Sequence, residues 1–329
     1  MTRYIGRFAP SPSGPLHRGS VVAAMASYLD AKAHQGKWLL RLEDIDRERC
    51  DPAHSKRILT DLEKLGFEWN DSVWVQSERS EFYQEALTRL QGQGETYRCY
   101  CSRKEITDSA TNQATEPPNS DFTVYPGTCR NLSVEPAGKQ ARAIRIALRP
   151  QTIAWDEGAW LPGTWPIGSQ VPPQFNEQVS NTVGDFVLAR PISSTGKIKS
   201  ASPTPNSYDW TYQLAVVVDD ALAGVTHIVR GQDLQGSTSR QIYLQQRLGL
   251  LTPQYWHCKL VLTDQGQKLS KQNGARGITS DAPMQVLNQA LSDLELPPLG
   301  NEQLQTFSLH AFWAHATLLW QHKMLQPTS

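Results

Sequence analysis

Residues 7–20 read RFAPSPSGPLHRGS, and this stretch decides the fold because it joins a predicted strand to a predicted helix. The apolar residues of 4–9 favour a short strand, and the prolines that follow exclude regular structure. Small and apolar residues over 21–33 are typical of a packed helix. Such a helix directs its free N–H groups and positive end at the loop, where Gly19 permits close backbone approach and His17 can donate to a phosphate. The stretch predicts a phosphate site, with a merely structural turn as the alternative.

The composition predicts a large water-soluble chain without a membrane span. Its 329 residues, with 39% hydrophobic residues and ten tryptophans, suffice for two or three domains or subdomains. The 32 basic residues cancel the 32 acidic ones, so a nucleic acid such as tRNA must be met by a local patch. No signal peptide pattern opens the sequence and no apolar run is long enough to cross a bilayer, so we expect a cytoplasmic protein.

The next two elements predict a parallel sheet. Residues 37–43 have a strand-like apolar run, and Asp51-Pro52 then signals the start of a helix. Alternating strands and helices predict an α/β fold with a doubly wound sheet, whose ligands lie beyond the carboxyl ends of the strands. Arg7 and Glu43 fall at such ends, where an arginine can bind a carboxylate and a glutamate an ammonium, as an amino acid requires. Alternatively, they pair with each other or with Arg41.

A β-rich insertion is predicted from residue 96 to 190, because the chain there is rich in Pro, Gly, Ser and Thr and its strands are short. Within it, the pattern Cys99-x-Cys101 and the later pattern Tyr125-x-x-x-Cys129 could converge on one tetrahedral zinc ion. Reduced, buried thiols are the alternative. Five cysteines, an odd number, in a chain without a secretion signal argue against a disulfide framework.

Beyond residue 190 we expect a polar loop or lid up to residue 209, followed by buried strands. The apolar run 212–218 leads into Asp219-Asp220, and residues 227–231 have the pattern of another buried strand. The end of that strand carries Arg230. Paired acids after a valine run are also common as helix N-caps, which leaves a structural interpretation of the two aspartates open.

Further helices are predicted from periodicity at 80–94, 237–248, 283–294 and 304–320. Gln241 is expected on the polar side of the second of these. Between the second and third helices, the loop sequence KLSK places Lys268 and Lys271 in a flexible, glycine-flanked segment. Their ammonium groups can move onto polyphosphate oxygens, although lysines in loops are usually only solvated.

Four stretches in the same order give the chain a resemblance to class I glutamyl-tRNA synthetases. Residues 7–20 resemble the HIGH region, 40–46 the next strand, 214–231 the second half-sheet and 268–271 the KMSKS loop. The KLSKQN form of the last motif and the early end of the chain resemble a shortened branch of this family without the anticodon-binding domain. Two positions depart from the motifs: Ser20 replaces the second HIGH histidine, and Gln272 replaces the last KMSKS serine.

The resemblance implies a Rossmann-like class I aminoacyl-tRNA synthetase catalytic domain with an inserted zinc-bearing subdomain and a short helical C-terminal region. The first half of the catalytic domain would span residues 1–95 and the inserted subdomain 96–190. The second half, with the KMSKS-like loop, would span 191–274, and the helical region 275–329.

The resemblance also implies the site residues. His17 and Lys271 would be catalytic. The glutamate contacts would be Arg7, Ala9, Ser11, Glu43, Tyr212 and Arg230. The ATP contacts would be His17, Gly19, Ser20, Lys268 and Lys271. The ligands of one structural Zn²⁺ would be Cys99, Cys101, Tyr125 and Cys129.

The implied activity is tRNA-independent activation of L-glutamate with ATP and Mg²⁺ to glutamyl-adenylate. A monomer would then transfer the glutamate to the queuosine base in the anticodon of tRNA(Asp). Two alternatives stay open: a truncated glutamyl-tRNA synthetase that charges a tRNA 3′ end, and a non-catalytic paralogue that binds RNA.

Overall fold

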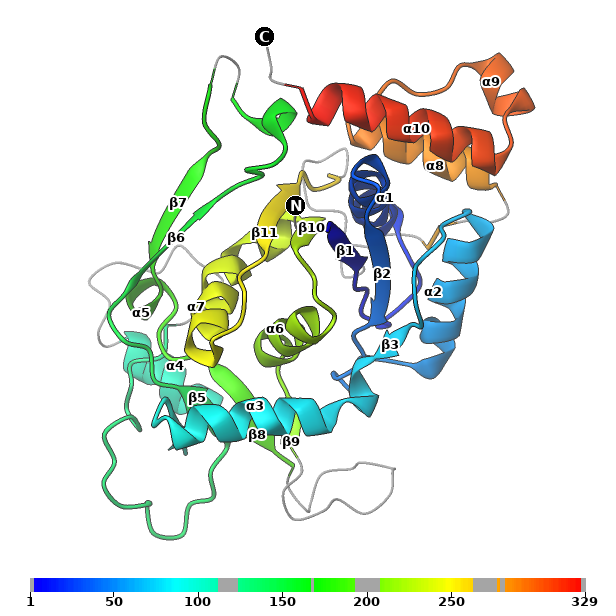
Figure 1. The fold of residues 1–329 in the computed structure, drawn as a ribbon. Coiled ribbons are helices and arrows are strands. Elements are labelled where there is room, and N and C mark those ends of the chain that lie inside the picture. The colour runs from blue at the N-terminus through cyan, green and yellow to red at the C-terminus, as the bar shows by residue number, and fades with distance from the viewer. Residues whose placement is uncertain are drawn as a thin grey trace.

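Parallel strands form the centre of the molecule in this computed structural model, which describes residues 3–111, 124–166, 169–192, 208–262, 277–278 and 282–326 (Figure 1). One set has the order β1 (Ile5–Phe8), β2 (Lys37–Leu42) and β3 (Trp74–Val75), and the other pairs β10 (His227–Gly231) with β11 (Gln254–Cys258). The N–H of Thr226 donates to the carbonyl of Ile5 at 2.9 Å and joins the two sets. The predicted parallel pairing of the first two strands is confirmed.

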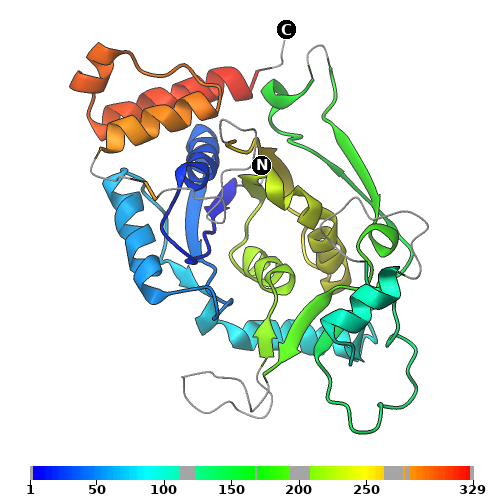
Figure 2. The same cartoon turned by 180° about the vertical axis from the view of Figure 1, so that it is seen from behind.

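Helix α1 (Arg18–Ala33) is buried along most of its length, as its small and apolar residues predict. It contacts β1, β2 and β10, and on its other side it packs against α8 (Pro283–Asp293) and α10 (Leu309–Met324) (Figures 1 and 2). The fully buried carboxylate of Asp30 in α1 accepts hydrogen bonds from Tyr4 Oη, Trp160 Nε1 and Trp320 Nε1. One side chain therefore ties the residue before β1, the segment at Trp160 and the last helix to α1.

The predicted starts of two further helices are confirmed. Asp51 caps α2 (Pro52–Lys64) by accepting from the N–H of Ala53 at 2.8 Å, and α3 (Ser80–Gly92) begins where the periodicity places it. The single helix predicted over 304–320 is wrong, because α9 (Asn301–Thr306) ends before extended Phe307. Ser308 then caps α10, accepting from the N–H of Ala311 at 3.1 Å.

The run 212–218 is helical, which corrects the expectation of a buried strand. It forms α6 (Tyr212–Leu222), and Asp219 and Asp220 lie in its last turns rather than at an N-cap. A continuous apolar run has no period that separates a buried strand from a buried helix, and α6 is buried on most sides. In α7 (Thr238–Leu248), Gln241 is buried, so its expected place on a polar face is also wrong.

Antiparallel strands occupy much of the segment predicted to be β-rich. A four-stranded sheet has the order β4 (Thr96–Cys99), β5 (Ala143–Ile146), β8 (Val187–Pro191) and β9 (Tyr208–Trp210). The strands β6 (Thr152–Asp156) and β7 (Gln174–Gln178) form a hairpin beside α7 (Figure 1). Because β9 follows residue 190, this sheet crosses a predicted boundary, and the division into four parts stays a prediction.

Short helices complete the described chain: α4 (Arg103–Thr111), α5 (Val179–Thr182), η1 (Gln76–Glu78), η2 (Pro162–Thr164) and η3 (Gln232–Ser237). None of the helices in the described ranges is long and apolar enough to span a lipid bilayer.

Candidate active site

A buried ion-pair network lies at the carboxyl ends of β1 and β2. Arg7 Nε is 3.2 Å from Asp220 Oδ1, and Arg41 Nη1 is 2.7 Å from the same oxygen. Arg41 Nη2 also donates to Glu43 Oε1 at 3.1 Å. All four side chains are at least nine-tenths buried. Buried charges require partners, and here α6 supplies a carboxylate for the arginines of both strands.

Asp219 extends the network to α3. Its carboxylate accepts from Arg79 Nε and Tyr83 Oη, each at 2.7 Å, and from Gln76 Nε2 at 3.0 Å. Arg41 Nε lies 3.8 Å from Asp219 Oδ2. The network thus balances three arginines with three carboxylates, and it connects β1, β2, α3 and α6.

The network shifts the pKa values of Glu43 and Asp220 in opposite directions. Burial raises the pKa of Glu43 because desolvation outweighs the attraction of Arg41 and Arg7. Burial also opposes ionisation of Asp220, but the two arginines outweigh it and lower the pKa of that carboxyl. An ammonium placed against Glu43 would favour its charged form, which is what the binding of an amino acid requires.

The expected glutamate contacts come partly together. Arg7 pairs with Asp220 rather than with Glu43, whereas Glu43 pairs with Arg41, as one alternative predicted. The N–H of Glu43 donates to the carbonyl of Pro10 at 3.0 Å, so the loop that carries Ala9 and exposed Ser11 lies beside Glu43.

Arg230 lies at the end of β10 and is held by uncharged acceptors. Its Nη1 is 3.4 Å from Tyr212 Oη and 2.7 Å from Gln241 Oε1. Its Nη2 donates to Thr238 Oγ1 and the Leu234 carbonyl, and its Nε donates to His257 Nε2. These five bonds equal the number of N–H groups on a guanidinium. The bond to Tyr212, the longest of them, is the one that a bound carboxylate would replace most readily.

His17 is the N-cap of α1. Its Nδ1 accepts from the N–H of Ser20 at 3.3 Å, and Ser20 Oγ accepts from the N–H of His17 at 3.5 Å, so the two residues form a reciprocal cap. Because Nδ1 is an acceptor here, the neutral imidazole carries its proton on Nε2. The departure from the HIGH motif at Ser20 therefore has a structural role at the start of the helix.

Lys268 and Lys271 lie outside the described residues. The chain that follows them returns to the His17 turn: Gly277 forms a β-bridge with His17, and the N–H of Ile278 donates to the carbonyl of Leu16 at 2.9 Å.

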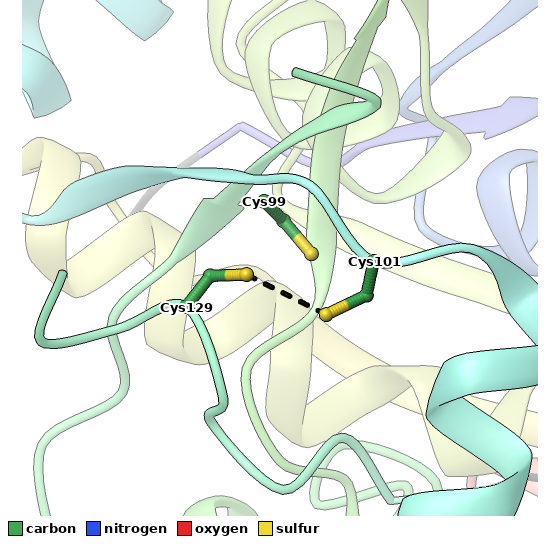
Figure 3. A group of neighbouring side chains, drawn as sticks. All are labelled: Cys99, Cys101 and Cys129. Carbon is green, nitrogen blue, oxygen red and sulfur yellow. Dashed lines mark hydrogen bonds between the residues drawn. The ribbon is translucent and has the colours of Figure 1, made fainter. Parts of the chain in front are cut away.

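Cys99, Cys101 and Cys129 form a cluster that could hold a metal ion (Figure 3). Their Sγ atoms all lie within 4.8 Å of one another, and those of Cys101 and Cys129 are 3.5 Å apart. The hydroxyl of Tyr125 lies 3.5 Å from Cys99 Sγ and 3.6 Å from Cys101 Sγ. Sulfur ligands of a tetrahedral zinc ion are about 3.8 Å apart, so these separations fit such an ion.

The local structure of the cluster also suits thiolate formation. Burial opposes ionisation of Cys129, but the N–H of Tyr100 donates to its Sγ at 3.4 Å, and this bond, with others from its neighbours, lowers the pKa of Cys129. Burial instead raises the pKa of Cys101 to about 11, so its ionisation requires a cation nearby.

Sequence reasoning missed the partners that hold the arginines. On sequence alone, Asp219 and Asp220 form the end of an apolar run or helix N-caps, and Glu157 and His257 have no predicted role. The available signal was charge balance: Arg7 and Arg41 lie on one predicted sheet and Glu43 balances only one of them, so at least one further acid was required if both arginines are buried.

The catalytic-domain model of class I tRNA synthetases of the E and Q type matches residues 5–152 and 198–288. The chain belongs to this family. It is 46% identical over 323 residues to the glutamyl-Q tRNA(Asp) synthetase of Verminephrobacter eiseniae, covering 98% of both chains. It is 45% identical over 296 residues to the protein of the same name from Neisseria meningitidis serogroup C, covering 89% of both. Both of these relatives, which the chain matches over most of their length, are named glutamyl-Q tRNA(Asp) synthetase.

A solved structure supports the fold. The glutamate-tRNA synthetase of Elizabethkingia anophelis superposes with a TM-score of 0.66 and 22% identity, covering 98% of this chain and 70% of that one. The architecture is therefore that of a class I aminoacyl-tRNA synthetase catalytic domain of mixed α/β class.

Proposed function

We propose that this enzyme activates glutamate with ATP, without tRNA, and transfers the glutamate to the queuosine base in the anticodon of tRNA(Asp). The match over almost the full chain to relatives named glutamyl-Q tRNA(Asp) synthetase carries this conclusion. A cytoplasmic location and a monomeric state, both expected from the sequence, belong to the same proposal.

The proposed glutamate site uses Arg7, Glu43 and Arg230. Glutamate presents two carboxylates and one ammonium, and these three side chains supply two cations and one anion at the strand ends. Arg7 is committed through Nε to Asp220, so its terminal nitrogens would meet the substrate. Tyr212, bound to Arg230, and the loop residues Ala9 and Ser11 would complete the contacts.

In the first step, an oxygen of the glutamate α-carboxylate forms a bond to the α-phosphorus of ATP, and the bond from that phosphorus to the bridging oxygen breaks to release pyrophosphate. In the second step, a hydroxyl oxygen of queuosine attacks the acyl carbon, loses its proton and displaces AMP. The protein supplies positioning and charge stabilisation rather than a nucleophile.

The proposed ATP site is the start of α1. The backbone N–H of Gly19, the hydroxyl of Ser20 and the Nε2–H of His17 would donate to phosphate oxygens. Lys271 precedes Gly277 by six residues, and the bridge from Gly277 to His17 supports a place for Lys268 and Lys271 near the same phosphates. Mg²⁺ bound with ATP would offset the negative charge of the phosphates.

Zinc is the metal that we assign to the cysteine cluster. Three thiolates and the phenol oxygen of Tyr125 form a soft, four-atom set that suits tetrahedral Zn²⁺, and the ion would be structural because the set leaves no open position. The four residues would tie β4 to the segment around Cys129.

Neither alternative is favoured. A truncated glutamyl-tRNA synthetase would share the site but charge a 3′ end, and the full-length relatives carry the glutamyl-Q name instead. A non-catalytic RNA-binding paralogue would have no need for the buried network of arginines and carboxylates beside the proposed ATP site at the start of α1.

Nuclease mapping tests the acceptor. With ATP and tRNA(Asp) that contains queuosine, labelled glutamate should be found in the anticodon fragment, because the acceptor hydroxyl belongs to that base. The same tRNA made without queuosine is the control and should stay unlabelled. Label in the 3′-terminal fragment would establish the truncated synthetase instead, and absence of glutamate-dependent ATP–pyrophosphate exchange would exclude both enzymes.

Replacing His17 tests whether the start of α1 binds ATP while the end of β1 binds glutamate. His17→Ala should lower kcat for pyrophosphate exchange about a hundredfold, because one preorganised donor to the phosphates is lost, while the KM for glutamate changes little. His17→Asn retains an N-cap acceptor and should show the same kcat loss without the loss of helix stability. Equal loss of glutamate binding and of kcat would show that His17 does not serve the ATP site alone.

Metal analysis tests the cysteine cluster. The purified protein should contain one zinc per chain, and Cys129→Ser should lose it because a soft thiolate is removed from the set. Cys258→Ala, at a buried cysteine outside the cluster, is the matched control and should keep the full zinc content. Equal zinc content in all three proteins, measured by mass spectrometry of the metal, would place the ion elsewhere.

A further inference from the structure

His257 lies opposite Arg230 in the register of β11 and β10. Its side chain is 1% exposed. Its Nε2 is 3.1 Å from Arg230 Nε and 3.2 Å from Thr238 Oγ1, and its Nδ1 is 2.9 Å from Glu157 Oε2. The imidazole thus bridges a carboxylate and the guanidinium proposed to bind glutamate.

These contacts define the protonation state of the ring. A carboxylate only accepts hydrogen bonds, so Nδ1 of His257 must carry a proton. A guanidinium only donates, so Nε2, which faces Arg230, must be unprotonated. His257 is therefore neutral, with its proton on Nδ1. Burial lowers its pKa, and Arg230 lowers it further, against the opposite influences of Glu157 and Asp233.

Glu157 is itself fixed to β11. It follows β6, forms a β-bridge with Tyr255, and its carboxylate accepts from both the backbone N–H and the ring of His257. The next residue, Gly158, donates to the carbonyl of Tyr255 at 2.8 Å. The loop end of the β6–β7 hairpin thereby packs behind Arg230.

We infer that Glu157 and His257 are positioning residues that set the affinity for glutamate by holding the guanidinium of Arg230. This inference rests on the proposed function. The acceptor at Nε fixes the plane of the guanidinium, and Gln241 and Thr238 fix its rotation. The Nη1 group of Arg230, which also contacts Tyr212, is then already oriented toward the substrate carboxylate before glutamate binds.

Protonation of His257 would reverse this arrangement. With a proton on Nε2, His257 could no longer accept from Arg230 Nε, and the positive imidazolium would repel the guanidinium. Because the pKa of His257 lies below the ordinary histidine value, the KM for glutamate should rise only in the acid range. Glu157 favours the imidazolium, so removing its charge should move that rise to still lower pH.

The experiment compares Glu157→Gln, His257→Gln and His257→Leu in glutamate-dependent pyrophosphate exchange as a function of pH. We expect about a tenfold higher KM for glutamate in His257→Leu, which leaves a buried N–H of Arg230 without an acceptor, and an unchanged KM for ATP. His257→Gln, which can supply an acceptor oxygen, should recover part of the affinity but lose the acid rise. Glu157→Gln should raise the KM at neutral pH and shift the acid rise downward.

Asp156→Asn is the matched control, since it removes a carboxylate one residue away that accepts from Gln174 Nε2 at 3.2 Å rather than from His257. It should behave as the wild type. Nitrogen-15 NMR of histidine-labelled protein gives a second readout that needs no variant activity, with the His257 signals assigned by their loss in His257→Gln. The ring should be neutral and protonated at Nδ1.

An Nε2–H tautomer would overturn the inference, as would an unchanged KM for glutamate in folded Glu157→Gln and His257→Leu. A wild-type protein without glutamate-dependent exchange would instead overturn the proposed function, and the NMR tautomer would still decide whether His257 holds Arg230.

Discussion

The fold depends on the burial of three arginines against three carboxylates. Asp219 and Asp220, adjacent in α6, turn to two different parts of the chain: Asp219 binds Arg79, Tyr83 and Gln76, whereas Asp220 binds Arg7 and Arg41. Arg7 and Asp220 are 213 positions apart in the sequence. Because a buried arginine without a partner is strongly destabilising, neither the first strands nor α6 can be buried alone. The network therefore fixes the two halves of the parallel core to one another.

The same constraint prepares the proposed site. Arg7 approaches the site already paired through Nε, while Arg230 is held by neutral acceptors and a neutral imidazole. The charge of Arg7 is therefore partly balanced by Asp220, whereas the acceptors around Arg230 carry no charge. Arg230 should consequently attract a substrate carboxylate more strongly than Arg7 does. Glu43, whose pKa is raised by burial, gains from an approaching ammonium. The start of α1 lies just beyond, so an amino acid and a phosphate would meet within one strand-to-helix turn.

Much of this organisation is predictable from local sequence. The prolines after Phe8 end the first strand, Asp51-Pro52 starts a helix, and the cysteine spacing identifies the cluster, all of which the structure bears out. The prediction of a strand for the valine run of α6 is wrong, because burial on most sides removes the amphipathic period that identifies a helix. The roles of Asp219, Asp220, Glu157 and His257 depend on contacts between distant segments, which no local pattern encodes. Ser308 is a local N-cap signal, and it marks the start of α10 within the longer helix predicted over 304–320.

The two adjacent aspartates provide the most direct test, because the account gives them different roles. Asp220→Asn should weaken glutamate binding about tenfold, measured by calorimetry, because an amide offers one acceptor oxygen instead of two and no longer holds Arg7 in place. Asp219→Asn, which touches α3 instead, should leave the glutamate Kd nearly unchanged and lower the free energy of unfolding by about 2 kcal/mol. Unchanged glutamate binding in folded Asp220→Asn, or equal weakening in both variants, would contradict the claim that Asp220 prepares Arg7 for the substrate.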